Sequence, residues 1–374
     1  MGKGLKKQTI VISAINFFEG GPLSVLKDNL KFANDVLSND FKIIALVHKK
    51  ELFILDDFKN IHIIEFPKSK GNYSVRLYLE YFHFKRLSKK WNPHLWFSLH
   101  DITPNVKAKI RAVYCHNPTP FKKVKISDLF FQPTIFLFSL FYKILYKINL
   151  KKNKYVVLQQ TWLKKEFVKM FRLSEQKVLV CHPVRLVSGN IPIASDFDKK
   201  GRPTTFFYPA LARPFKNFEV IGKAVKFLEE NHIGDFQVII TIKGDENNYA
   251  KYIHRKYSNL INLHFTGMLT PKEVEEIYVK TDALLFPSTL ETWGLPITEF
   301  KGHNKPIILS NLPYAYETIG KYDKACFFDP YDAKDLSNKM ISFINGNLNF
   351  DVTSNIKDEV LSGWADLYSK ILRE

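Results

Sequence analysis

The chain alternates between short apolar runs and longer segments with the spacing of amphipathic helices. This alternation predicts mostly parallel sheets with crossover helices, because parallel strands are covered on both faces and read as continuous apolar runs. The predicted strands of the first half are Thr9–Ala14, Phe41–Val47, Ile61–Phe66, Leu95–Leu99, Ala112–Cys115, Tyr155–Leu158 and Val178–Val180. Those of the second half are Thr205–Tyr208, Phe236–Lys243, Ile261–Phe265, Ala283–Phe286, Pro306–Ser310 and Cys326–Phe328.

The periodicity breaks once, between Val184 and Thr204, where Ser, Gly, Asn and Pro residues gather. A chain of 374 residues is also longer than one typical hydrophobic core. We therefore predict an N-terminal α/β domain over residues 1–185, a linker over 186–204 and a second α/β domain over 205–350. Two such halves leave a cleft between them.

The composition narrows the choice of partner. The formal charge of +18 fits nucleic acid, anionic lipid or a phosphorylated substrate, although a lysine-rich solvated surface accounts for part of it. Three widely separated cysteines without metal-ligand spacing indicate a reducing compartment and no structural zinc. The apolar run Thr9–Ile15 is too short for a signal peptide, and we expect no membrane span.

The most informative stretch runs from Phe286 to Glu299. A buried strand ends at Phe286, and Pro296 suits the start of a helix, which places Glu291 in the strand-end loop and Glu299 in the first helical turn. Gly294 allows a ligand to approach the backbone. Two carboxylates suit the hydroxyls of a hexose and a ribose, but an acid in a first turn also interacts favourably with the helix dipole.

This stretch carries a resemblance to a known family. Phe286-Pro287-Ser288, followed by two glutamates eight positions apart around Gly294-Leu295-Pro296, closely resembles the C-terminal signature of retaining family 4 (group 1) glycosyltransferases. The similarity covers roughly residues 206–335, with Phe300–His303 in place of the family's small residues. It implies the GT-B fold, two Rossmann-like domains with parallel sheets facing a central cleft. It also implies a C-terminal helix over 351–374 that crosses back to the N-domain.

The resemblance also implies roles for residues. Glu291 would contact the donor sugar and Glu299 the ribose, while the backbone of Gly294 and Leu295 would face the diphosphate or the sugar. Gly267 lies in the family's strand–glycine–helix segment and joins the donor-binding set.

Two cations follow the first strand of the second half. Arg213 and Lys216 lie in the loop before the predicted helix Phe218–Asn231, where they can neutralise a leaving diphosphate. A lysine is more often a solvated surface charge. The family's basic residue at this point favours Lys216, whereas Arg213 is shifted. In the family such cations replace a metal, so the resemblance implies no metal and no cofactor besides the nucleotide-diphosphate sugar.

Several strand ends of the first half supply acceptor-side candidates. Gly20 and Gly21 form a turn before a helix, which matches the family's glycine loop but is often only a tight turn. His116 matches a family histidine near the donor sugar, although a lone histidine is more often structural. His100 and Asp101 follow Leu95–Leu99 and are a second candidate that lines the same face. Weaker candidates follow Tyr155–Leu158: Gln160, Thr161 and Trp162.

The segment Leu129–Leu150 has helical periodicity with lysines. Lys143 and Lys147 fall on one predicted face with Ser139, and Phe138, Phe141, Leu145 and Ile148 fall on another. Flanking lysines add positive charge, so the segment fits an amphipathic helix on an anionic membrane surface. The alternative is an internal helix with a lysine-rich outer face.

Together these features predict a retaining, metal-independent glycosyltransferase, cytoplasmic and peripheral at the inner face of the cell membrane. It would transfer a hexose or 6-deoxyhexose to a lipid-linked surface glycan such as O-antigen or capsule, or to an oligosaccharide acceptor. Retention in the family is explained by front-face attack, with the leaving phosphate accepting the proton. Two alternatives stay open: a glucan or trehalose-type synthase acting on a soluble acceptor, and a non-catalytic nucleic-acid-binding or scaffold protein of the same fold. No RNA-recognition motif supports the latter.

Overall fold

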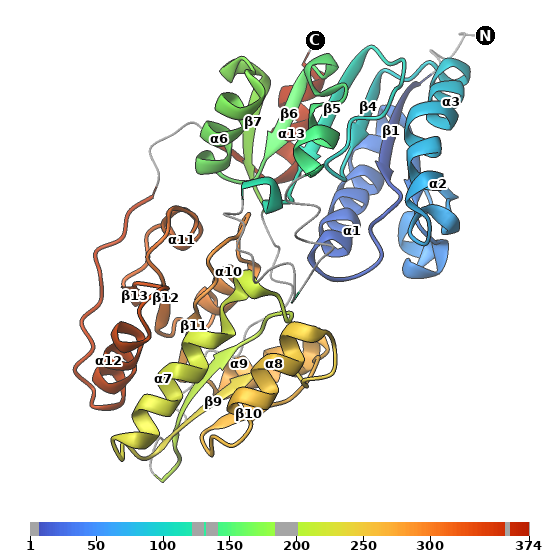
Figure 1. Ribbon diagram of the computed structural model, residues 1–374. Helices are drawn as coiled ribbons and strands as arrows, with labels where there is room; N and C mark the ends of the chain where they lie inside the picture. The colour runs from blue at the N-terminus through green and yellow to red at the C-terminus, as the bar shows by residue number, and fades with distance from the viewer. Residues whose placement is uncertain (1–6, 122–130, 132–140, 184–200, 356–359, 374) are drawn as a thin grey trace. The chain divides into compact units, whose positions relative to one another are not determined.

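Figure 1 presents a computed structural model of the chain, which describes residues 7–121, 131, 141–183, 201–355 and 360–373. The chain divides into two compact units. Unit 1 comprises Met1–Pro120, Phe141–Arg185 and Asp358–Glu374, and unit 2 comprises Phe121–Leu140 and Leu186–Lys357. Most of the linker expected at 186–204 lies outside the described residues.

Unit 1 is built on an eight-stranded sheet in the order β14-β7-β6-β5-β4-β1-β2-β3. All its strand pairings are parallel, as the continuous apolar runs predict. Its strands are β1 (Gln8–Ala14), β2 (Phe41–Val47), β3 (Ile61–Glu65), β4 (Leu95–Ser98), β5 (Ile110–Cys115), β6 (Tyr155–Leu158), β7 (Val178–His182) and β14 (Leu361–Ser362). The two-residue strand β14 is too short for a periodicity argument and was not expected.

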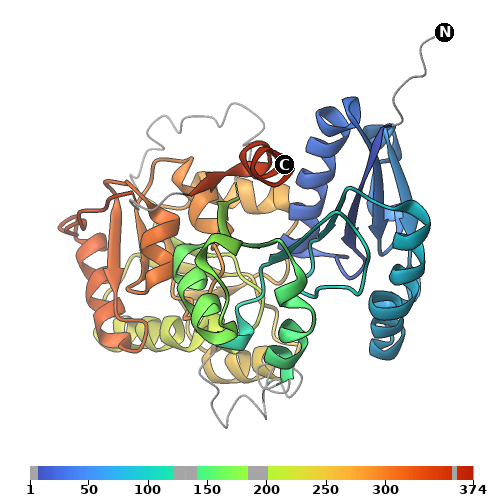
Figure 2. The same cartoon turned by 90° about the horizontal axis from the view of Figure 1, so that it is seen from above.

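Helices cover both faces of this sheet. They are α1 (Gly20–Asp35), α2 (Tyr73–Tyr78), the π-helix η5 (Leu79–His83), α3 (Phe84–Trp91), α6 (Thr161–Phe171) and α13 (Gly363–Leu372), and residues 141–147 are also helical. One core cluster joins the sheet to α1 and α13, and another joins it to η5 and α3. Figure 2 shows α1 (blue) and α13 (red) side by side, where the Asn29 amide hydrogen-bonds with the buried Tyr368 hydroxyl at 3.2 Å.

Unit 2 contains a six-stranded parallel sheet in the order β10-β9-β8-β11-β12-β13. The strands are β8 (Thr204–Tyr208), β9 (Phe236–Ile240), β10 (Leu263–Phe265), β11 (Ala283–Phe286), β12 (Ile307–Ser310) and β13 (Ala325–Phe328). The helices are α7 (Phe218–Glu230), α8 (Asn248–Tyr257), α9 (Pro271–Lys280), α10 (Leu295–Lys301), α11 (Pro313–Ile319) and α12 (Ala333–Ile344). Each strand predicted for this half is present, and the predicted α/β class with two parallel sheets is confirmed.

The strand orders locate a switch point in each sheet. In unit 2 the chain runs from β8 outward through β9 and β10 and returns to β11 on the other side of β8. In unit 1 it runs from β1 through β2 and β3 and returns to β4 on the other side of β1. Loops leaving two such strands diverge to opposite sides, and ligands of open α/β sheets bind in the crevice between them.

Close packing in unit 2 gives a first prediction. A Cβ atom on Gly222 of α7 would lie 2.6 Å from Cγ of the Tyr257 ring of α8, so one helix would have to move. Gly222→Ala should cost about 1–3 kcal/mol of overpacking, more than the gain of about 1 kcal/mol in helix propensity. We expect a lower melting temperature. Gly234→Ala, with no atom within 4 Å of the new Cβ, should melt as the wild type does; an equal melting temperature for both variants would contradict the packing.

Candidate active site

Two strand-end loops of unit 2 are bound to each other at the switch point. The loop after β8 reaches Asn217, and the loop after β11 begins at Pro287. The Thr289 N–H donates to the Phe215 carbonyl at 2.7 Å, and the Asn217 amide donates to the Pro287 carbonyl at 3.2 Å. Asn217 holds a left-handed backbone with φ of +58°, which asparagine tolerates better than most residues. These bonds hold the two loops as one rigid support.

Lys216 and Glu291 meet on this support. The Lys216 ammonium donates to the Glu291 carboxylate, and the two side chains are 18% and 12% exposed. The structure therefore brings together two residues that lie 75 positions apart and that the sequence assigned separately to phosphate and sugar. Both remain partly accessible, so a ligand can reach them.

Helix α10 carries the second predicted carboxylate. It begins at Leu295, one residue before Pro296, so Glu299 lies in the second turn and the expected first-turn position is wrong. The Tyr278 hydroxyl donates to Glu299 at 3.2 Å and orients it. Gly294 precedes the helix with φ of +86°, and a Cβ there would lie 3.2–3.3 Å from Ile297 and the Phe286 ring. Only glycine fits this turn without strain.

The other donor-side candidates lie at strand ends of unit 2. Arg213 is exposed and caps the short 3-10 turn Pro214–Lys216, next to the ion pair. Gly267 follows β10 with φ of +78°, and its N–H donates to the Ile242 carbonyl at 3.3 Å. This bond joins the segment after β10 to the segment after β9.

In unit 1 the strand ends of β4 and β5 meet at Asp101. Its Oδ1 atom accepts the N–H of His116 at 2.8 Å, the N–H of Asn117 at 3.1 Å and the hydroxyl of Tyr146 at 2.7 Å. The His116 side chain is 16% exposed, with its Nδ1 3.6 Å from the same oxygen. Burial lowers the pKa of His116, and the carboxylate of Asp101 opposes that shift.

His100 is fully buried and bonded to Glu80. Its Nε2 lies 2.5 Å from Glu80 Oε1, and both residues have no exposed surface. Arg76 of α2 donates to the His100 carbonyl at 3.4 Å. This burial favours a structural role for His100 over acceptor contact. Neither Glu80 nor Arg76 was singled out from the sequence, because nothing in the pattern of α2 and η5 distinguishes them from residues of a solvated helix.

The remaining candidates lie at helix starts of unit 1. Helix α1 begins at Gly20, earlier than expected. Gly20 has a φ of +64°, and a Cβ atom built on it would have no other atom within 4 Å. Gly21 follows in the same turn. Thr161 is the first residue of α6 and is buried, and the Trp162 indole donates to the Gln160 side chain at 2.5 Å. The structure places Gly20 and Gly21 after β1 and Thr161 after β6.

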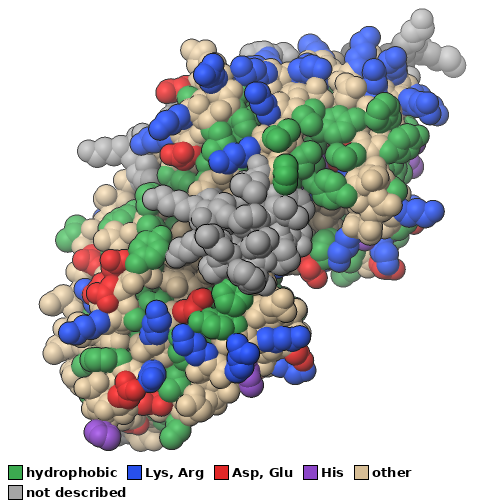
Figure 3. Space-filling view, in the orientation of Figure 1, with side chains coloured by type: hydrophobic (Ala, Val, Ile, Leu, Met, Phe, Trp, Pro, Cys, Tyr) green, Lys and Arg blue, Asp and Glu red, His purple; other side chains and the backbone are tan. Residues whose placement is uncertain are grey.

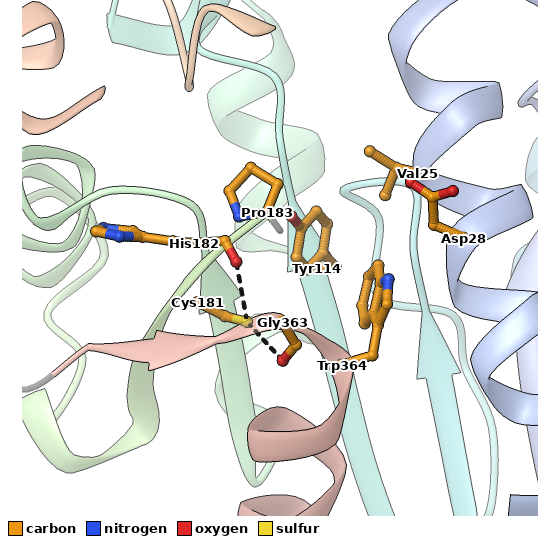
Figure 4. A pocket seen from close by; sticks show the side chains of 8 residues that line it. All are labelled: Val25, Asp28, Tyr114, Cys181, His182, Pro183, Gly363 and Trp364. Carbon is orange, nitrogen blue, oxygen red and sulfur yellow. Dashed lines mark hydrogen bonds between the residues drawn. The ribbon is translucent and has the colours of Figure 1, made fainter. Parts of the chain in front are cut away.

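Two hollows of unit 1 lie apart from these residues. Figure 4 shows the first, of about 20 Å³, between α1, β5, β7 and the start of α13, with Cys181 Sγ 3.3 Å from the Gly363 carbonyl oxygen. It has room for one water molecule. The second, about 730 Å³ and open, lies at the amino ends of β1–β3, opposite the strand ends that carry the candidates.

Comparisons with known proteins agree with this geometry. The sequence model of the family described as "Glycosyl transferases group 1" matches residues 193–358. The chain is 23% identical to the O-antigen chain mannosyltransferase RfbU of Salmonella typhimurium over 209 residues, about 55% of the length of each protein. The part of the chain that carries the donor-side candidates is thus similar in sequence to the group 1 glycosyltransferases (family 4).

Solved structures show the fold. A glycosyltransferase from Rickettsia africae superposes with a TM-score of 0.64 at 17% identity, covering 93% of this chain and 90% of that one. HepE of Anabaena, solved in complex with UDP and glucose, gives a TM-score of 0.60 at 12% identity, with 91% and 89% covered. The predicted GT-B fold is thereby confirmed.

Glu219, at the start of α7, gives a prediction of how the stability of the fold depends on pH. The Tyr249 hydroxyl donates to the Glu219 carboxylate, whose pKa is raised by burial. Because the folded state favours the protonated acid, stability falls as pH rises through this raised pKa. Glu219→Gln should therefore melt higher than the wild type at pH 8, and the difference should vanish in acid.

Thermal melting from pH 4 to pH 8 measures this effect. The exposed Glu276→Gln is the control, with no pH-dependent difference expected. A Glu219→Gln variant less stable than the wild type at pH 8 would contradict the sign.

Proposed function

We propose that the chain transfers a hexose or deoxyhexose from a nucleotide-diphosphate sugar to a growing, lipid-linked surface glycan, with retention of configuration. The observation that carries the proposal is the Lys216–Glu291 pair on two interlinked strand-end loops at the switch point of unit 2. A relative named as an O-antigen chain mannosyltransferase and a fold neighbour solved with UDP and glucose support the substrate class.

Different side chains would bind different parts of the donor. Lys216 and the exposed Arg213 would neutralise the diphosphate, and Glu291, released from Lys216, would accept hydrogen bonds from the sugar hydroxyls. Glu299, oriented by Tyr278, would hold the ribose. The backbone of Gly294 and Leu295 would face the phosphates. Within the described residues no group of three or more His, Cys, Asp or Glu side chains could hold a metal ion. In the proposed chemistry, the two cations neutralise the charge of the phosphates.

On the acceptor side, His116 and the turn at Gly20 and Gly21 would approach the donor sugar. All three follow strands of unit 1 at their carboxyl ends. No side chain is assigned as a nucleophile, because the leaving phosphate can accept the proton of the attacking hydroxyl.

The helix at 141–147 supports a lipid surface as partner. Its inward face consists of Tyr142 and Tyr146, which are 4% and 1% exposed. This differs from the expected division into faces, because Phe141 and Ile148 are exposed beside the lysines; Phe138 and Ser139 lie outside the described residues. The exposed apolar side chains are Phe141, Ile144 and Ile148, at 56%, 59% and 38%.

Charge complements these apolar groups. Lys143, Lys147, Lys151 and Lys152 are exposed, and residues 141–154 include no acidic residue. Figure 3 shows hydrophobic side chains gathered on the upper part of one face with Lys and Arg around them. No described helix is long and apolar enough to cross a membrane. We therefore propose docking onto anionic lipid by shallow insertion, each lysine adding about 1 kcal/mol.

The donor site is tested by two substitutions. Glu291→Ala should mainly reduce kcat and Glu299→Ala should mainly weaken donor binding, because each loses charged hydrogen bonds worth about 1.5–3 kcal/mol. Transfer from a panel of nucleotide sugars and donor binding by calorimetry measure both. The exposed Glu276→Ala should match the wild type. Near-normal transfer by both site variants, with the fold intact, removes these residues from the site.

The lipid surface is tested by charge reversal. Changing Lys143, Lys147, Lys151 and Lys152 to Glu should reduce co-sedimentation with anionic vesicles and transfer to a lipid-linked acceptor, and should spare transfer to a short soluble acceptor. Wild-type binding should weaken with salt without vanishing. A control variant makes the same charge change in unit 2, at the exposed Lys251, Lys272, Lys280 and Lys334. It should bind vesicles more strongly than the variant of the helix lysines. If the wild-type protein stays in the supernatant at low salt, the helix has no role in lipid binding.

A further inference from the structure

Three hydrogen bonds converge on one oxygen in unit 1. Asp101 Oδ1 accepts from the backbone N–H groups of His116 and Asn117 and from the hydroxyl of Tyr146, all between 2.7 and 3.1 Å. These donors come from two elements, the exit of β5 and the helix at 141–147. Asp101 itself follows β4, so a single carboxylate connects three separate segments.

The backbone of Asp101 is specialised for this position. Its φ is +69°, in the left-handed region that aspartate and asparagine tolerate better than most residues. Its own N–H donates to the Tyr114 carbonyl at 3.1 Å, which holds the turn against β5. The residue is only 3% exposed. A buried carboxylate is costly unless its oxygens are hydrogen-bonded, and here three donors meet that need.

The ring of His116 is confined by its neighbours. It packs edge-on against Phe17, with ring centroids 4.9 Å apart, and stacks with Tyr114 at 6.3 Å. Its Nδ1 lies 3.6 Å from Asp101 Oδ1, beyond hydrogen-bond distance. Asp101 therefore acts on His116 chiefly by fixing its main chain, while the two rings fix the plane of the imidazole.

We propose that Asp101 is a positioning residue that holds His116 for sugar transfer, and that Tyr146 holds Asp101. This inference rests on the proposed function, in which His116 approaches the donor sugar. Misplacement of a reacting group by about 1 Å can cost on the order of 100-fold in rate, so loss of the Tyr146 bond acts on turnover and leaves donor affinity nearly unchanged.

A matched pair of tyrosine variants tests this inference. Tyr146→Phe removes one hydroxyl from the Asp101 cluster, and Tyr368→Phe removes an equally buried hydroxyl that bonds to Asn29 instead. Tyr146→Phe should lower kcat about 10-fold with the donor KM changed less than about 2-fold, whereas Tyr368→Phe should keep the wild-type kcat. Melting temperatures of both variants separate lost folding from lost positioning. Equal kcat for the two variants overturns the proposal.

Asp101→Asn separates geometry from charge. Asparagine tolerates the left-handed backbone and keeps an oxygen that can accept the three bonds, so kcat should fall less than in Asp101→Ala. The pKa of the His116 imidazole, followed by NMR, should decrease in Asp101→Asn because the opposing carboxylate charge is lost. The other groups that act on this imidazole, namely the Leu99 backbone, Arg76 on α2 and His100 with its partner Glu80, are unchanged in this variant.

The outcomes distinguish this inference from the proposed function. Transfer that is lost in Glu291→Ala but retained at the wild-type rate in Asp101→Ala overturns the positioning role alone. A wild-type chain that transfers no sugar from any nucleotide donor overturns the proposed function and the inference with it. Equal kcat in Asp101→Asn and Asp101→Ala also overturns the inference, because the oxygen that accepts the three hydrogen bonds would then not affect turnover.

Discussion

The parallel direction of both sheets is the constraint on which the rest of the structure depends. Every strand of a parallel sheet delivers its carboxyl end to the same edge, so side chains far apart in sequence meet there without any further device. In unit 2 this brings Lys216 after β8 to Glu291 after β11, and in unit 1 it brings Asp101 after β4 to His116 after β5. In each unit, these polar side chains lie at the edge of the sheet where the strands have their carboxyl ends.

The two edges use buried charge differently. The Lys216–Glu291 pair is partly exposed, and both groups can exchange partners with a ligand at modest cost. Asp101 and Glu80 are almost completely buried, so their hydrogen bonds cannot be given up without leaving an unpaired charge. The first arrangement suits binding and release of a charged donor, and the second suits a fixed geometry around His116.

The helix at 141–147 contributes both to the buried polar cluster around Asp101 and to the exposed surface. Its inner tyrosines reach the buried polar cluster, and its outer side presents apolar groups and lysines. A helix has room for both because successive side chains point in different directions around its axis. In the proposed function, one helix therefore takes part in lipid contact on one side and in positioning His116 on the other.

Much of the fold was predictable from the sequence because it depends on local patterns. Continuous apolar runs gave the strands, and the stretch from Phe286 to Glu299 indicated the family and the edge of the sheet where its carboxylates lie. Tertiary structure alone decided which polar groups meet: that Lys216 pairs with Glu291, that Tyr278 orients Glu299, and that Tyr146 reaches Asp101. It also decided which side of the helix at 141–147 is buried. These contacts join residues from separate elements, and their energies depend on burial and on hydrogen-bond geometry, which the order of residues along the chain does not contain.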